Sequence, residues 1–88
     1  MTQEEFLAMA AQDGASELVL VTREARAALD LHAHPFEATA LVLRGALTIG
    51  VDGAERVYRA GQVFHLPAGC AHSEWYGERG VTYLVARS

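Results

Sequence analysis

The 88-residue chain is 51% hydrophobic and 20% charged, which is typical of a folded globular protein and excludes an intrinsically disordered one. Its formal net charge is −4 and its pI is about 5.4. The chain has no lysine and its arginines form no patch along the sequence, so we expect neither a nucleic-acid partner nor an anionic-membrane partner. A single cysteine excludes an intrachain disulfide, and without a signal peptide or a membrane-length apolar run we expect a cytoplasmic protein.

The length indicates one domain, and a chain this short buries only about 60–65% of the surface that its unfolded form exposes. Its apolar content is high for so small a domain. Some apolar surface and some open sheet edges should therefore meet a second subunit, and we expect a homodimer.

The first stretch predicts a short helix from Thr2 to about Gln12, ended near Gly14. Thr2 followed three residues later by Glu5 is a capping-box pattern, in which each residue satisfies a backbone N–H of the other. This segment carries no chemistry that we can identify. Its apolar residues, which gather toward one face, are Phe6, Leu7, Met9 and Ala10.

From residue 15 onward, short strand-like segments alternate with turn signals, and no helix-length pattern interrupts them. This spacing predicts an all-β barrel or sandwich and not a parallel α/β sheet, with residues 1–14 as a helical segment and 15–88 as the β-barrel domain. The expected turns are at Gly45, Asp52-Gly53, Ala60-Gly61, Pro67–Gly69 and Gly77–Gly80. The expected strands are Glu17–Thr22, Ala25–Leu31, Ala38–Leu43, Ala46–Val51, Glu55–Tyr58, Val63–Leu66, Ala71–Tyr76 and Val81–Ala86.

Two histidines precede the apolar strand Ala38–Leu43. His32 and His34 are two residues apart, so in an extended chain both side chains point to the same face and both rings could hold one ion. A turn follows at Pro35. The pair therefore lies at the mouth of a buried strand.

A second stretch contains Gly61, Pro67, Gly69 and His72 in the spacing Gly-x5-Pro-x-Gly-x2-His. Together with His32, His34 and the later Gly45, it resembles the two motifs of the cupin superfamily, over about residues 17–88. The resemblance implies a cupin-type double-stranded β-helix, or jelly-roll barrel, with a short N-terminal helix.

The resemblance also implies that His32, His34 and His72 converge inside the barrel and bind a divalent metal through ring nitrogens. Three imidazoles leave metal positions open, which suits Fe, Mn, Ni, Cu or Zn without choosing among them. The alternative is that these histidines are ordinary polar residues at a barrel mouth.

The chain departs from the family at the glutamate of the first motif, which would fall at Ala38 or Thr39. The acid that is present, Glu37, comes one residue earlier. Its odd spacing from His34 puts it on the opposite strand face, so it would need a bulge after Pro35 to turn inward.

Glu74 is the second candidate acid, and it is suggested by this sequence and not by the family. It lies two residues beyond His72, hence on the same face of the expected strand. It could be a fourth ligand, a partner that orients a histidine, or a general base. A solvated glutamate at the rim, with water completing the site, is the other interpretation.

The remaining polar and aromatic candidates are assigned mainly to structure. We expect His65 to face outward between core-facing neighbours, and Cys70 to be a small buried hydrophobe more readily than a reactive thiol. The aromatic residues that could line a pocket, or simply fill the core, are Phe36, Phe64, Trp75, Tyr76 and Tyr83. The expected core residues are Leu41, Leu43, Leu47, Ile49, Val63 and Leu84.

The sequence thus predicts a small metal-binding cupin that binds, and in one version converts, a small polar metabolite at the three-histidine site. In the catalytic version, Glu74 or Glu37 would move the proton. The alternative is a non-catalytic ligand-binding or sensor module, favoured by the absent motif glutamate and the small size. A third hypothesis is a protein that binds no metal and in which the two motifs keep only a structural role.

Overall fold

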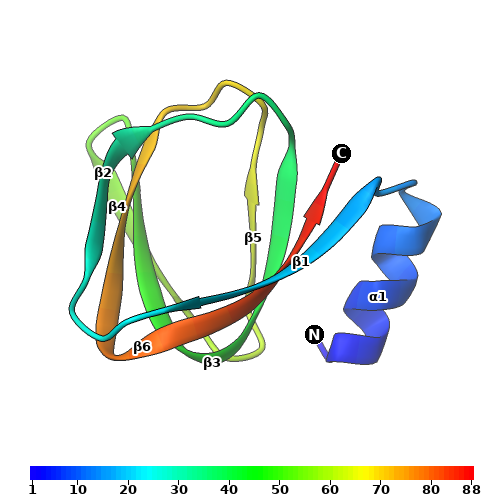
Figure 1. Cartoon of the computed structure of the whole chain (residues 1–88), viewed down its shortest axis with the longest axis horizontal. Helices are drawn as coiled ribbons and strands as arrows, with labels where there is room; N and C mark the ends of the chain where they lie inside the picture. The colour runs from blue at the N-terminus through cyan, green and yellow to red at the C-terminus, as the bar shows by residue number, and fades with distance from the viewer.

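The computed structural model describes all 88 residues, and it consists of a small β-barrel with one helix packed on its outside (Figure 1). The helix and strands are α1 (Gln3–Gln12), β1 (Glu17–Arg23), β2 (Ala28–His32), β3 (Ala38–Val51), β4 (Ala54–Arg59), β5 (Val63–Leu66) and β6 (His72–Arg87). All strand pairs are antiparallel. The predicted all-β jelly roll with a short N-terminal helix is confirmed.

Two long strands, β3 and β6, hold the barrel together because each runs through both of its halves. In one half, β1 pairs with residues 81–87 of β6 and β5 pairs with residues 38–41 of β3. In the other half, β2 pairs with residues 72–75 of β6 and β4 pairs with residues 46–51 of β3. β3 and β6 pair with each other in both halves, so the two four-stranded layers share their central strands.

The turns expected at Gly45 and at 77–80 are wrong, because the chain remains extended through both positions. The β3–β6 register instead shifts on either side of residues 44 and 45, which marks a bulge where the paired strands bend. Gly45 and Gly80 have φ of 78° and 71°, and a Cβ on Gly45 would lie 2.1 Å from the Gly80 carbonyl oxygen. Both glycines are therefore needed for the positive φ and the close backbone approach of a barrel corner. In the sequence, a glycine at such a corner looks the same as a glycine in a turn.

The helix begins and ends as the sequence predicts. The Glu5 backbone N–H donates to Thr2 Oγ1 at 3.1 Å, and the Thr2 N–H donates to Glu5 Oε1 at 2.9 Å, which completes the capping box. α1 covers the outer face of the sheet, where Phe6 is fully buried. The outer cluster, as we call this group, consists of Phe6, Ala10, Leu41 and Ala86, with Met9, Ala15, Leu43, Val63 and Leu84 packed against it.

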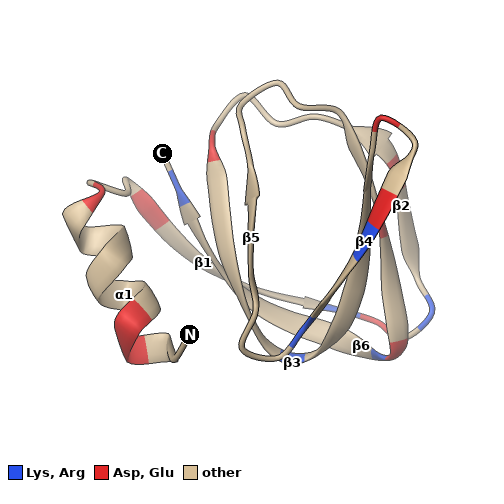
Figure 2. Ribbon diagram, turned by 180° about the vertical axis from the view of Figure 1, so that it is seen from behind, with Lys and Arg blue, Asp and Glu red and all other residues tan.

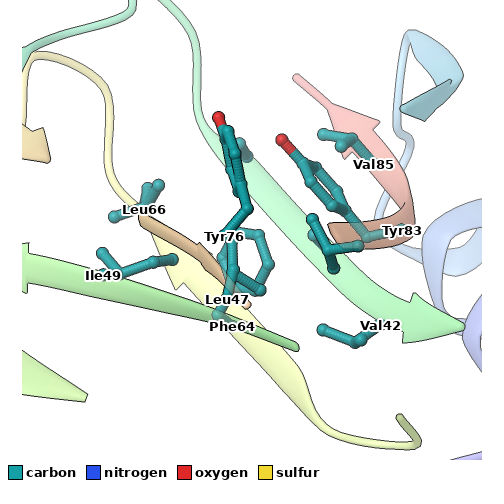
Figure 3. Packing of buried hydrophobic residues seen from close by; sticks show 11 residues of the cluster. Val42, Leu47, Ile49, Phe64, Leu66, Tyr76, Tyr83 and Val85 are labelled. Atoms are coloured by element: carbon teal, nitrogen blue, oxygen red, sulfur yellow. The ribbon is translucent and has the colours of Figure 1, made fainter. Parts of the chain in front are cut away.

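The barrel interior holds a second and larger group of buried side chains, the inner cluster (Figure 3). Tyr76 and Tyr83 belong to it, and Figure 3 shows their phenol oxygens pointing to the same side of the core. The core that the sequence predicted as one list is therefore divided between two faces of the same strands. The inner cluster consists of Ala38, Ala40, Val42, Leu47, Ile49, Phe64, Leu66, Tyr76, Val81, Tyr83 and Val85.

Most charged residues are exposed to solvent. α1 has acidic residues in its first turn and no Lys or Arg, whereas the basic positions are distributed over several strands and turns (Figure 2). Glu4 and Glu5 in that first turn interact favourably with the positive end of the helix dipole. No helix in the structure has the length and apolar character needed to cross a bilayer.

Candidate metal centre

Three histidines and one glutamate meet at one end of the barrel. His32 ends β2, His34 follows in the loop, and His72 and Glu74 stand at the beginning of β6. The antiparallel register places His32 opposite His72. One donor atom from each of the four residues lies within 4.8 Å of all the others, so these residues could hold one metal ion.

Backbone carbonyls orient two of the imidazoles. His32 Nδ1 is 2.7 Å from the Asp30 carbonyl oxygen, and His72 Nδ1 is 3.1 Å from the Cys70 carbonyl oxygen. A carbonyl oxygen only accepts, so in both rings Nδ1 carries the proton and donates. In the neutral ring, Nε2 then presents a lone pair to the centre of the cluster, which is the arrangement of a metal-binding histidine.

Glu74 is buried and both of its carboxylate oxygens are engaged. Oε1 accepts a hydrogen bond from the Tyr76 hydroxyl at 3.1 Å. Oε2 lies 3.2 Å from His32 Nε2 and 3.3 Å from His72 Nε2. Tyr76 therefore holds the carboxylate so that its other oxygen faces the two histidine lone pairs.

These atoms fit a cation at the centre of the cluster. Either a proton on His72 Nε2, which would donate to Glu74 Oε2 at 3.3 Å, or a cation between these atoms would offset the repulsion between a nitrogen lone pair and the carboxylate oxygen. His32 Nε2 is buried and, although close to Glu74 Oε2, is not aligned for a hydrogen bond, so it has no hydrogen-bond partner. Three imidazole nitrogens and one carboxylate oxygen are ligands that divalent transition metals prefer, and a metal would satisfy the orphaned nitrogen.

His34 completes the cluster from the loop. Its ring stacks on Phe36, with centroids 4.9 Å apart and planes 16° from parallel. Burial lowers the pKa of His34 below its ordinary value of 6.5, and the neighbouring His32 and His72 act in the same direction. The lowered pKa favours the neutral ring, which is the form that ligates a metal.

Glu37 does not reach the cluster. Its backbone N–H donates to the Ser88 carbonyl oxygen at 2.9 Å, which keeps this residue on the outer side at the start of β3. Its Oε1 is 3.1 Å from Nε2 of His65, and both side chains are about half exposed. No bulge turns it inward. A small cavity lies beside the histidines, and Ala38 lines it with only a methyl group. Glu74 is the acid that the structure brings to the histidines.

The other candidates take structural or external positions. His65 faces outward, and Cys70 is half-buried, with its carbonyl oxygen rather than its thiol directed to His72. Trp75 is wrong as a core residue because it is 60% exposed on the outside of β6, where it lines a surface pocket of about 440 Å³. Phe64, Tyr76 and Tyr83 belong to the inner cluster.

Two arginines beside the histidines were missed by sequence reasoning. Arg23 and Arg87 line the same cavity of about 70 Å³ as His32, His34 and Glu74. Both lie one residue beyond the strands expected at 17–22 and 81–86. The alternation of side chains along a strand could have found them. Arg23 is two residues after Val21 and Arg87 is two residues after Val85, so each arginine points to the same inner face as that valine.

Comparison with known proteins agrees with this architecture. The family model described as "Cupin domain" matches residues 19–84. A comparison with curated proteins found no significant match.

Among solved structures, the chain is similar to KdgF from Halomonas sp., with 22% identity and a TM-score of 0.72 over 81% of this chain and 66% of that protein. It is also similar to a cupin-2 domain containing protein from Shewanella frigidimarina, with 21% identity and a TM-score of 0.67 over 81% of this chain and 69% of the other. A variant of oxalate decarboxylase from Bacillus subtilis has 21% identity and a TM-score of 0.70 over 81% of this chain and 20% of the enzyme.

This chain spans less than two thirds of the Halomonas protein and a fifth of the decarboxylase chain. At these identities the structural matches establish the fold. The family model covers most of the sequence, and its barrel architecture is the one observed here. The chain therefore belongs to the cupin family.

Proposed function

We propose that this protein binds a divalent transition metal, Fe, Mn, Ni, Cu or Zn, through His32, His34, His72 and Glu74, and binds a small polar metabolite next to it. The observation that carries the proposal is the convergence of these four donor atoms within 4.8 Å. The carbonyl contacts that direct the Nε2 atoms of His32 and His72 inward support it. Four protein ligands leave further positions open on a metal that prefers five or six ligands.

A metal bound here would supply Lewis acidity to an oxygen of the ligand. Residues of the chain orient the side chains that would bind this metal. The Asp30 and Cys70 carbonyls fix the ring orientations, Tyr76 fixes the Glu74 carboxylate, and Phe36 packs against His34. Ligand groups would enter from the side of the cavity that Arg23 and Arg87 line.

The test is elemental analysis of the protein purified without a polyhistidine tag, beside the double variant His32→Ala/His34→Ala. We expect near-stoichiometric metal in the wild type and loss of that metal in the double variant. The matched control is His65→Ala, which removes an imidazole outside the cluster and should keep the metal. A wild type that stays empty after incubation with Fe, Mn, Ni, Cu and Zn would refute the proposal.

The second candidate function is a ligand-binding or sensor module without turnover. It is favoured by the engagement of Glu74, whose Oε1 accepts from Tyr76 and whose Oε2 faces His32 and His72, so that neither oxygen is free to move a proton. Glu37, the other candidate acid, lies outside the cluster. Saturable binding of small acids or sugars by the metal-loaded protein without product would support this candidate. Turnover that is lost in Glu74→Gln would favour the enzyme.

We also propose a homodimer in the cytoplasm. The edge strand β1 supports the dimer because its Leu18 and Leu20 are 50% and 62% exposed, and edge strands with apolar side chains are usually covered. Light scattering that shows a monomer at micromolar concentration would refute it.

A further inference from the structure

Two buried side-chain atoms in this chain lack a hydrogen-bond partner, and their residues line the same cavity. They are His32 Nε2 and Arg87 Nε. Buried polar atoms are rarely left unpaired, and each exception needs an explanation. The proposed metal would satisfy the histidine nitrogen. Arg87 Nε is an N–H donor on a cation, so it needs an acceptor that the chain itself does not supply.

Arg87 is fixed in place while this donor stays free. Its NH1 group donates to Glu17 Oε1 at 2.9 Å, and its Cζ lies 4.6 Å from the centroid of the Phe36 ring. Phe36 in turn stacks on His34. The guanidinium is therefore held beside the proposed metal ligands, and little side-chain freedom would be lost when Nε–H meets an acceptor.

A second guanidinium adds positive charge to the same cavity. Arg23 lines it together with Arg87. The one acidic residue that lines the cavity is Glu74, which is turned toward the histidines. Two arginines and a metal would together favour an anionic ligand.

Apart from the charged residues, His32, His34 and Tyr83, the lining of the cavity is apolar, and the space is small. The cavity volume of about 70 Å³ is a little more than two water molecules occupy at about 30 Å³ each in the liquid, so the ligand can have only a few non-hydrogen atoms inside. Phosphate and sulfate have no apolar part to place against this wall, whereas a carboxylate with a short hydrocarbon chain does. The apolar side chains of the lining are Val21, Leu29, Ala38, Phe64, Leu66 and Val85.

We propose that this cavity binds a short-chain carboxylate. The carboxylate accepts a hydrogen bond from Arg87 Nε–H and faces Arg23, and its hydrocarbon part packs against the apolar wall. The inference rests on the proposed function, because the ligand occupies the side of the cavity next to the proposed metal. It narrows "small polar metabolite" to one chemical class.

The test uses the ¹⁵N–¹H NMR signal of Arg87 Nε in the zinc-loaded protein, with zinc content measured in every sample. Arg87→Lys assigns the signal by removing it. Acetate and propionate should shift the signal saturably, whereas equal concentrations of phosphate and chloride should not. Calorimetry should show carboxylate affinity roughly 10- to 100-fold lower in Arg87→Lys, because a hydrogen bond to a charged group is lost.

Two further variants test whether a change in carboxylate affinity comes from this cavity. Arg23→Gln, at an exposed position, should also weaken carboxylate binding, and it serves if Arg87→Lys does not fold. Arg44→Gln makes the same charge change at an exposed position outside the cavity and should leave both zinc content and carboxylate affinity unchanged.

The outcomes separate the two proposals. A zinc-loaded wild type whose Arg87 signal ignores carboxylates would overturn the carboxylate inference and leave the metal site intact. A signal that responds equally to phosphate or chloride would reveal a general anion site and overturn it as well. A wild type that takes up no zinc or other divalent metal would overturn the proposed function itself.

Discussion

The outer face of the layer formed by β1, β6, β3 and β5 differs from the inner face of the barrel in what it buries. On the outer face, α1 covers only apolar side chains, with Phe6 and Leu41 at the centre. On the inner face of the barrel, the apolar cluster gives way at one end to His72 and Glu74, which are buried and polar and lie in the part of β6 that pairs with β2. Because side chains alternate along a strand, one strand serves both faces, and stability and function can be changed separately.

The largest expected effect on stability is on the outer face. Phe6→Ala should lower the free energy of unfolding by about 3–5 kcal/mol, because a fully buried ring is replaced by a cavity. In thermal unfolding followed by circular dichroism, each 1 kcal/mol corresponds to a Tm decrease of roughly 4–8 °C. Leu7→Ala, at a partly exposed position of the same helix, should cost much less. The comparison of the two faces fails if the folded Phe6→Ala variant has lost its metal.

Removal of the proposed metal should have the next largest effect, and it acts on the inner face. With free metal at about 100 times Kd, binding to the folded state alone adds about 2.7 kcal/mol, so a chelator should lower Tm by roughly 10–20 °C. Scanning calorimetry with and without chelator measures this shift. It should vanish in His32→Ala/His34→Ala and persist in Phe6→Ala. Equal shifts in all three proteins would place the metal elsewhere.

Tyr76→Phe should separate two roles of Tyr76 on the inner face, which are to orient the Glu74 carboxylate and to pack in the core. The variant keeps the buried ring and removes the 3.1 Å hydrogen bond to Glu74 Oε1. Loss of such a supporting contact typically weakens metal binding 10–100-fold, whereas the loss of stability is about 1 kcal/mol. Competition with a metal-binding dye measures the affinity. Tyr58→Phe, which changes a tyrosine on β4, is the control, and an unchanged affinity in Tyr76→Phe would mean that Tyr76 does not orient Glu74.

The smallest expected effect is the pH dependence of the helix cap. Hydrogen bonds from Thr2, the backbone one first, lower the pKa of Glu5 below its ordinary value of 4.5. Because the folded-state pKa is the lower one, the stabilisation is fully present above pH 4.5 and is lost as pH falls through the folded-state pKa.

Glu5→Gln tests this effect because glutamine keeps the capping-box geometry without the charge. The Tm difference between wild type and variant should be greatest near neutral pH and should shrink below pH 4.5. Metal content should be the same in both proteins, since the cap lies on the outer side. A Tm difference that does not change with pH would show that the Glu5 charge contributes nothing.

Much of the fold could be predicted from local patterns. The helix cap at Thr2 and the strand Val63–Leu66 agree with the structure because capping and strand alternation depend on residues close in sequence. The turns expected at Gly45 and at 77–80 were wrong because a glycine with positive φ serves a bulge as well as it serves a turn. Only the pairing of β3 with β6 distinguishes the two.

The sequence by itself determined that Glu74 shares a strand face with His72, because the period of a strand is a local property, whereas His34 lies in the loop after β2 and not on a shared strand face with His32. Only the tertiary structure decided which acid reaches the histidines. The register of β2 against β6 sets His32 opposite His72 beside Glu74, while pairing with Ser88 keeps Glu37 outside. Strand register depends on partners far apart in the chain, and no local pattern contains it.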